Sequence, residues 1–97
     1  MRIAVDVNVS NREIGELTRE GDLVVCTARP REEDWRWLER ALEKDADIII
    51  SQDLDIPNLL DHWRVSDDVL YFKTINSYRE WRGKNVQFKQ KATTQKK

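Results

Sequence analysis

Residues 45–60, DADIIISQDLDIPNLL, decide the fold and contain the most unusual feature of the sequence. The apolar run Ile48–Ile50 is typical of a strand that is buried on both faces, because no polar residue interrupts it. Two carboxylates, Asp53 and Asp55, follow shortly after the run. The segment therefore predicts a buried strand that brings acidic side chains to its carboxyl end.

Strand-like and helix-like segments alternate along the whole chain. The expected strands are residues 2–7, 22–27, 46–50 and 68–73, and the expected helices are residues 10–20, 32–44, 57–63 and 77–83. This order predicts an α/β fold, a three-layer sandwich with a four-stranded, mainly parallel sheet. With the common strand order 2-1-3-4, the carboxyl ends of the strands share one edge, where ligands bind in open α/β sheets.

Local signals set the helix boundaries. Ser10 and Glu13 form a capping box at the start of the first helix, and Gly21 ends that helix. Asp55 suits the start of the third helix, and Gly83 is expected to end the last one. Apolar residues at helical spacing predict the buried face of the second helix. They are Trp35, Leu38 and Leu42, and Trp37 and Ala41 widen the same stripe.

Composition excludes several classes of protein. The chain has 97 residues, of which 39% are hydrophobic and 36% charged, as expected for one small folded domain. The single cysteine, Cys26, allows no internal disulfide. No apolar run approaches the roughly 20 residues of a membrane helix, and residues 1–10 lack the apolar core of a signal peptide. We therefore expect a cytoplasmic protein with no membrane partner.

Charge is distributed unevenly. Residues 83–97 contain five lysines and no acid, whereas residues 1–82 contain all 18 acids and the other 12 basic residues. We expect a domain of residues 1–82 followed by a flexible basic tail, which either holds a polyanion near an acidic site or is simply a solvated terminus. Three basic residues near aromatic side chains are candidates for binding substrate phosphates: Arg79, Arg82 and Lys84.

Acidic residues collect at the predicted carboxyl edge of the sheet. Asp6 ends the first strand, and Asp53 and Asp55 follow the third, which is its expected neighbour. Glu33 and Asp34 begin the helix that leads into the third strand, and one of them can reach the same edge. The alternative interpretations are that Asp55 only caps its helix and that Asp34 only favours the helix dipole.

Such a group of carboxylates favours a bound divalent cation. Carboxylates that lie close together repel one another unless a proton or a cation separates them. Oxygen ligands select Mg²⁺ or Mn²⁺, and one histidine with one cysteine leaves no structural zinc site. A pair of such ions suits phosphodiester hydrolysis, in which one activates water and the other stabilises the leaving oxygen.

Three segments together resemble a compact PIN-like domain: residues 1–10, MRIAVDVNVS; residues 32–41, EEDWRWLERA; and residues 46–55, ADIIISQDLD. Such domains begin with a strand that ends in Asp, have an acid at the start of a middle helix, and continue with a strand ending in an [S/T]-x-D-x-D-like motif. Asp6-Val7-Asn8 stands where small members read D-E-N, and residues 51–55 stand where they read T-x-D-x-D. The resemblance covers about residues 1–60.

The resemblance implies an Mg²⁺- or Mn²⁺-dependent ribonuclease of the kind found in toxin–antitoxin systems or RNA processing. RNA would be its substrate, and an antitoxin or a second copy of the chain would be its protein partner. Carried over by position, the catalytic metal ligands would be Asp6, Asp34, Asp53 and Asp55. Of Glu33 and Asp34 we prefer Asp34 as the middle acid, because Trp37 and Leu38 then fall inward behind it. Ser51 and Asn8 would support them.

Two departures leave alternatives open. Val7 replaces an acid that the family often has, and the chain is shorter than most PIN-type toxins. A catalytically inactive PIN-like module that acts through a protein partner or a homodimer is the main alternative. A Toprim-like metal domain also uses D-x-D after a strand, but it requires Glu where this chain has Asp6.

Overall fold

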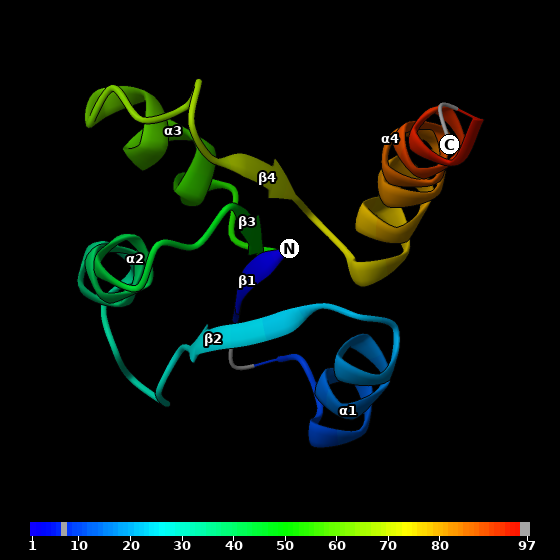
Figure 1. Cartoon of the computed structure of the whole chain (residues 1–97). Coiled ribbons are helices and arrows are strands. Elements are labelled where there is room, and N and C mark those ends of the chain that lie inside the picture. The colour runs from blue at the N-terminus through cyan, green and yellow to red at the C-terminus, as the bar shows by residue number, and fades with distance from the viewer. Residues whose placement is uncertain (7, 96–97) are drawn as a thin grey trace.

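Four strands alternate with four helices along the chain (Figure 1). The computed structural model describes the backbone of residues 1–6 and 8–95 and the side chains of these residues as far as 85. The elements are β1 (Arg2–Val5), α1 (Asn11–Arg19), β2 (Leu23–Thr27), α2 (Asp34–Glu43), β3 (Ile48–Ile50), α3 (Asp55–His62), β4 (Leu70–Phe72) and α4 (Ile75–Gln95). The expected order of strands and helices is confirmed.

The four strands form one parallel sheet in the order β2-β1-β3-β4. Strand β1 therefore lies between β2 and β3, and Val5 pairs with Ile50 near their carboxyl ends. Each strand returns to the sheet through a helix, so the carboxyl ends of all four strands meet at one edge. This is the edge at which the sequence predicts the acidic residues.

Two apolar clusters lie on the two faces of the sheet. Ile49 packs in a cluster with residues of α2 and α3, whereas Ile48 and Ile50 pack in a cluster with residues of α1 and α4. Successive side chains of a strand point to opposite faces, so every position of β3 is buried. This explains the uninterrupted apolar run, and it gives the helix–sheet–helix layering of a three-layer α/β sandwich.

Helix α1 has the predicted ends. The Ser10 hydroxyl accepts a hydrogen bond from the Glu13 N–H, and the Glu13 carboxylate accepts one from the Ser10 N–H, which completes the capping box. At the other end Gly21 has a φ of 98°, and the N–H groups of Gly21 and Asp22 donate to carbonyls of the last turn. This is a Schellman motif, which needs a left-handed residue at the Gly21 position.

The sequence predicted that helix α4 ends at Gly83. The helix instead continues to Gln95. Glycine ends a helix when it adopts a positive φ, and among the described glycines only Gly21 does so. At a helical φ, glycine only weakens the helix by about 1 kcal/mol relative to alanine. The expected boundary after residue 82 therefore falls within a helix, and the side chains of the lysines beyond Lys84 lie outside the described residues.

Hydrogen bonds and aromatic contacts hold the first turns of α4 against the sheet. The Tyr78 hydroxyl donates to Asp22 Oδ1 over 2.7 Å, and both side chains are buried. The Tyr78 ring also packs with Phe72 and Trp81.

Over the part of the chain that the structure describes, no helix has both the length and the apolar character needed to cross a membrane.

Two leucines test this packing because they differ mainly in burial. Leu17 of α1 is 0% exposed, whereas Leu23 at the start of β2 is 53% exposed. We expect Leu17→Ala to lower the free energy of unfolding by about 2–5 kcal/mol, because it removes apolar contacts and leaves a cavity. Leu23→Ala should change it by less than about 1 kcal/mol. Urea unfolding curves measure both values, and equal effects would contradict the placement of α1.

Candidate metal centre

The site begins where β1 and β3 end side by side. The Asp6 N–H donates to the Ile50 carbonyl over 3.0 Å, which extends the strand ladder by one residue. Side chains alternate along a strand, so Asp6 and Ser51 continue the pattern of Ala4 and Ile49 and point toward the face covered by α2 and α3. There the Ser51 hydroxyl donates to Asp6 Oδ2 over 2.6 Å.

Ser51 also orders the loop that leads into α3. Its Oγ accepts from the Asp53 N–H at 3.0 Å, and Asp53 Oδ1 in turn accepts from the Asp55 N–H at 2.9 Å. Leu54 occupies the N-cap position and makes no side-chain cap bond. The expectation that Asp55 caps this helix is therefore wrong, because Asp55 lies in the first turn and Asp53 accepts its N–H.

Tyr71 supports the same loop, and its role was missed in the sequence. The Tyr71 hydroxyl donates to the Ser51 carbonyl over 2.7 Å, and its pKa is raised by burial and by the negative charges of Asp53 and Asp6. Because its hydrogen-bond partner is a backbone carbonyl, no pattern of side chains in the sequence could have revealed the contact.

Three carboxylates converge beyond this loop. Asp34, Asp53 and Asp55 each present an oxygen, and these oxygens all lie within 4.8 Å of one another. Asp34 is the first residue of α2 and Asp55 the first residue of α3, so the positive ends of two helix dipoles favour negative charge here. Asp34 and Asp53 are partly buried, and Asp55 is exposed.

When Asp34 is protonated, its side chain hydrogen-bonds to Asp53. The side-chain hydrogen bond from Asp34 to Asp53, burial, and the charges of Asp53, Asp6 and Asp55 raise the pKa of Asp34 to about 6. The same hydrogen bond, together with the N–H of Asp55, lowers the pKa of Asp53. Asp34 therefore carries the shared proton under mildly acidic conditions. Asp6 contributes its charge to the site and is joined to Asp53 through Ser51.

The two acids that precede Asp34, Glu32 and Glu33, bind other side chains rather than Asp53. The Glu33 carboxylate accepts a hydrogen bond from the Trp35 indole N–H. Glu32 pairs with Arg40, and this contact lowers the pKa of Glu32 to about 2. Of the three consecutive acids, Asp34 is the one whose carboxylate reaches Asp53, as preferred from the sequence.

Of the two expected supporting residues, Asn8 contributes less to the cluster than Ser51. Asn8 is exposed and lines a small cavity of about 150 Å³ beside Asp6, away from the three converging carboxylates. Lys73 lines the same cavity, and the sequence analysis did not single it out. Val7, which stands where the PIN-like family often has an acid, lies outside the described residues.

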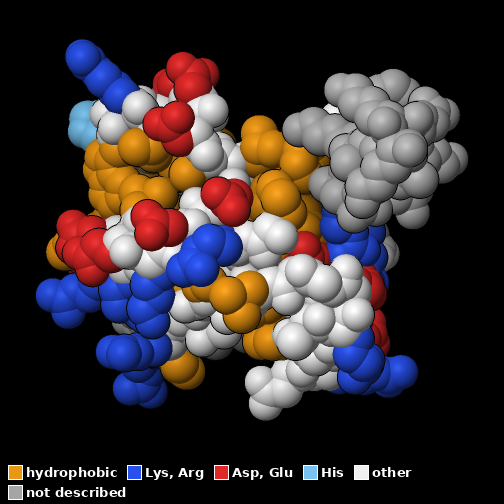
Figure 2. All heavy atoms as spheres, viewed as in Figure 1, with side chains coloured by type: hydrophobic (Ala, Val, Ile, Leu, Met, Phe, Trp, Pro, Cys, Tyr) orange, Lys and Arg blue, Asp and Glu red, His pale blue; other side chains and the backbone are white. Residues whose placement is uncertain are grey.

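The structure does not bring the expected substrate-binding arginines to the carboxylates. Arg79 forms ion pairs with Glu20 at 2.8 Å and Glu16 at 3.2 Å, and Arg82 pairs with Glu20 and Asp22. Figure 2 shows basic and acidic side chains beside one another at the right of the view. Asp22 precedes β2, so these pairs lie toward the amino edge of the sheet. The reason is the direction of α4, which starts after the carboxyl end of β4 and runs back along the sheet. Lys84 lies further along the same helix and is exposed.

A groove of about 730 Å³ adjoins the carboxylates, between the start of α2 and one side of α3. Its lining residues are Glu32, Glu33, Asp34, Trp35, Asp55, Asn58, Leu59 and His62. Trp35 was expected on the buried face of α2 but is 42% exposed. The buried residues are Trp37, Leu38 and Ala41, all three of which the apolar stripe predicted, and Trp35 lies at the margin of this face in the first turn.

Comparison with known proteins identifies no relative: no family model, curated protein or solved structure matches the chain.

The shared proton predicts a pH-dependent stability. Between about pH 4 and about pH 6 the folded protein holds a proton on Asp34 that the unfolded chain has lost, so the free energy of unfolding falls as pH rises through this range. The lowered pKa of Asp53 affects the free energy of unfolding at more acidic pH. We expect Asp34→Asn to remove this decline and to be more stable than the wild type above pH 6, by about 1 kcal/mol after allowance for solvent screening.

Urea unfolding at a series of pH values without divalent ions measures this effect. The matched control is Asp61→Asn, which changes an exposed acid of α3 outside the cluster and should keep the wild-type pH dependence. An unchanged decline between pH 4 and pH 6 in Asp34→Asn would contradict the shared proton.

Proposed function

We propose that this chain is a small PIN-like nuclease that uses Mg²⁺ or Mn²⁺ to hydrolyse phosphodiester bonds of RNA. The observation that carries the proposal is the convergence of Asp34, Asp53 and Asp55, which come from two helix starts and the loop after β3. Asp6 adds a fourth carboxylate from the neighbouring strand. The fold places four acids at the edge where open α/β sheets bind ligands.

The donor set fits a hard divalent cation. All three converging side chains offer carboxylate oxygens, which suit Mg²⁺ and Mn²⁺ rather than zinc. The side chains of Asp34 and Asp53 lie close enough to share a hydrogen bond when Asp34 is protonated, and a cation would balance the two negative charges that remain when it is not. When bound, a divalent ion supplies Lewis-acid catalysis and lowers the pKa of water.

The residues of the chain then have distinct roles. Asp34, Asp53 and Asp55 would hold the ion, and Ser51 positions Asp6 and Asp53 relative to each other through two hydrogen bonds. Tyr71 fixes the Ser51 backbone from the adjacent strand. Rigid support of this kind is what metal ligands need, because small displacements of a carboxylate weaken binding and catalysis.

Cleavage of single-stranded RNA tests the function directly. With Mn²⁺ present we expect the wild type to cleave a labelled RNA and Asp53→Asn to cleave it roughly 100-fold more slowly or worse, because the ion loses a charged ligand. Asp61→Asn, the same substitution at an exposed position of α3, should retain activity. Equal rates in Asp53→Asn and the wild type would rule out the proposed site. No cleavage by any variant, together with no Mn²⁺ binding, would favour the inactive binding module.

Ion binding can be tested without catalysis. Ser51 is 2% exposed and hydrogen-bonds both Asp6 and Asp53, so Ser51→Ala should leave these groups poorly oriented. We expect it to weaken Mn²⁺ binding by about 10- to 100-fold in isothermal titration calorimetry. Ser66→Ala, at an exposed position, is the matched control. Equal Mn²⁺ affinity in Ser51→Ala and the wild type would show that Ser51 does not organise the ligands.

A further inference from the structure

The groove between α2 and α3 is continuous with the acidic cluster. Asp34 and Asp55 belong to both, so a ligand held at the carboxylates has the groove as its immediate extension. Its volume of about 730 Å³ falls within the range of small-molecule sites, roughly 300–1,000 Å³. The groove can therefore accept a group as large as a nucleotide.

Trp35 gives the groove an aromatic wall that is held in place from two directions. Its indole N–H donates to Glu33, and the guanidinium carbon of Arg36 lies 5.5 Å from its ring centroid. The side chain is nevertheless 42% exposed, which is unusual for a residue that could have joined the core. A fixed, accessible indole is a suitable platform for stacking a planar ligand, since little side-chain freedom is lost on binding.

The opposite wall comes from one side of α3. Asn58 and His62 are one helical turn apart and both exposed, and Leu59 lies between them with its side chain partly buried. Asn58 offers an amide that can donate and accept hydrogen bonds, and an imidazole offers the same pair of functions. An apolar floor with such groups at its border matches the edge of a nucleobase better than it matches a hydrocarbon.

A basic pocket of about 390 Å³ borders the groove on the side of the β2–α2 loop. It is lined by Arg29, Arg31 and Arg36 together with Glu32 and Glu33, which also line the groove. The Glu32 charge is compensated by Arg40. Within the described residues, none of the three lining arginines forms an ion pair with an acid. Their positive charge is thus available to a phosphate.

We propose that this groove binds an unpaired nucleobase of single-stranded RNA, which stacks on Trp35, while Arg31 and Arg36 neutralise a neighbouring phosphate. The proposal rests on the proposed function, which places the scissile phosphate at Asp34, Asp53 and Asp55. A bound RNA strand would then meet the acidic cluster, the aromatic wall formed by Trp35 and the basic pocket, in that order. A duplex would not fit this arrangement, because its bases are already paired and stacked.

Binding of a 2′-O-methyl RNA, checked on a gel to remain intact, tests the aromatic wall. We would titrate a labelled oligonucleotide of about eight nucleotides with Mg²⁺ present and follow fluorescence anisotropy. We expect Trp35→Ala to weaken binding about 5- to 100-fold, since one stacked base is lost, and Trp35→Phe to retain most of the affinity. Leu23→Ala, which changes an exposed apolar residue of β2, is the control and should bind as the wild type does.

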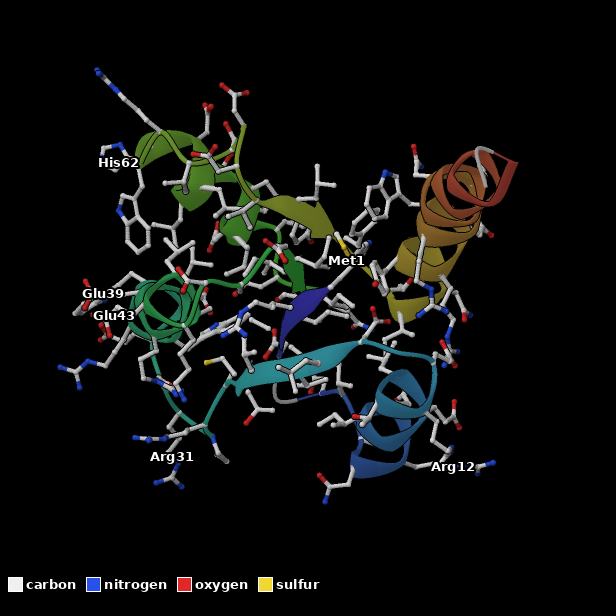
Figure 3. The ribbon with its side chains drawn as sticks, in the orientation of Figure 1. Met1, Arg12, Arg31, Glu39, Glu43 and His62 are labelled. Carbon is white, nitrogen blue, oxygen red and sulfur yellow. The ribbon has the colours of Figure 1, made fainter. Side chains whose placement is uncertain are left out.

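The basic pocket is tested by charge removal. Figure 3 shows Arg31 in the loop that leads into α2 and Arg12 on α1, which packs on the other face of the sheet. Arg31→Gln should weaken binding and reduce the slope of log affinity against log salt by about 1, because one phosphate contact is lost. Arg12→Gln should leave both the affinity and the slope unchanged.

The outcomes separate this inference from the proposed function. If Trp35→Ala binds the oligonucleotide as tightly as the wild type, or if the wild type binds a duplex equally well, the groove does not hold a base. Metal-dependent cleavage that needs Asp53 would still support the nuclease. If binding depends on Trp35 but no RNA is cleaved, the inference stands and the catalytic proposal fails. Absence of binding by the wild type would overturn the inference.

Discussion

The parallel pairing of β1 with β3 is the constraint on which the rest of the site depends. These strands are separated by α1, β2 and α2 in the sequence, yet their ends meet in register, with Val5 opposite Ile50. The register places Asp6 beside Ser51, and a single hydroxyl then joins Asp6 to the loop that carries Asp53. A shift by one residue would turn one of these side chains to the other face of the sheet and dismantle the connection.

The two edges of the sheet deal with acidic residues in different ways. Near the amino edge, Glu16, Glu20 and Asp22 are paired with Arg79 and Arg82, which fastens α4 to α1 and β2. At the carboxyl edge, by contrast, no lysine or arginine among the described residues forms a salt bridge with the three converging aspartates, and the pKa of Asp34 is raised beside Asp53. A guanidinium would neutralise these charges permanently, whereas carboxylates that pair with no Lys or Arg leave room for a cation.

This arrangement sets stability against function. Carboxylates that are close together and partly buried repel each other, so the fold retains them only because helix starts, Ser51 and Tyr71 hold the segments in place. The same rigid support would orient the carboxylates as ligands for an ion. Functional sites commonly contain residues that lower stability, because binding needs groups that the folded protein alone does not. Trp35 is a second example. Its exposed side chain contributes less buried apolar area to the core, but it leaves an aromatic surface open to a ligand.

The sequence by itself determined the architecture and the edge that bears the site. The apolar run in β3, the capping box of α1 and the alternation of strands and helices are local patterns, and each depends on the chemistry of neighbouring residues. The parallel sheet and the presence of Asp53 and Asp55 at a strand end follow from those patterns, whereas the order β2-β1-β3-β4 matches the common order that we assumed. The preference for Asp34 as the acid near Asp53 and Asp55 also rests on a local pattern, the spacing of the apolar residues that follow it in α2.

Only the tertiary structure decided which side chains meet. It separated Asp34 from Glu33, paired Arg79 and Arg82 with distant acids, exposed Trp35, and brought Tyr71 to the Ser51 backbone. These outcomes depend on helix rotation and direction after packing, which the sequence leaves open because several rotations bury similar apolar area. Helix α4 gives the same lesson, since Gly83 permits a helix end but its backbone conformation, set by the folded chain, allows the helix to continue.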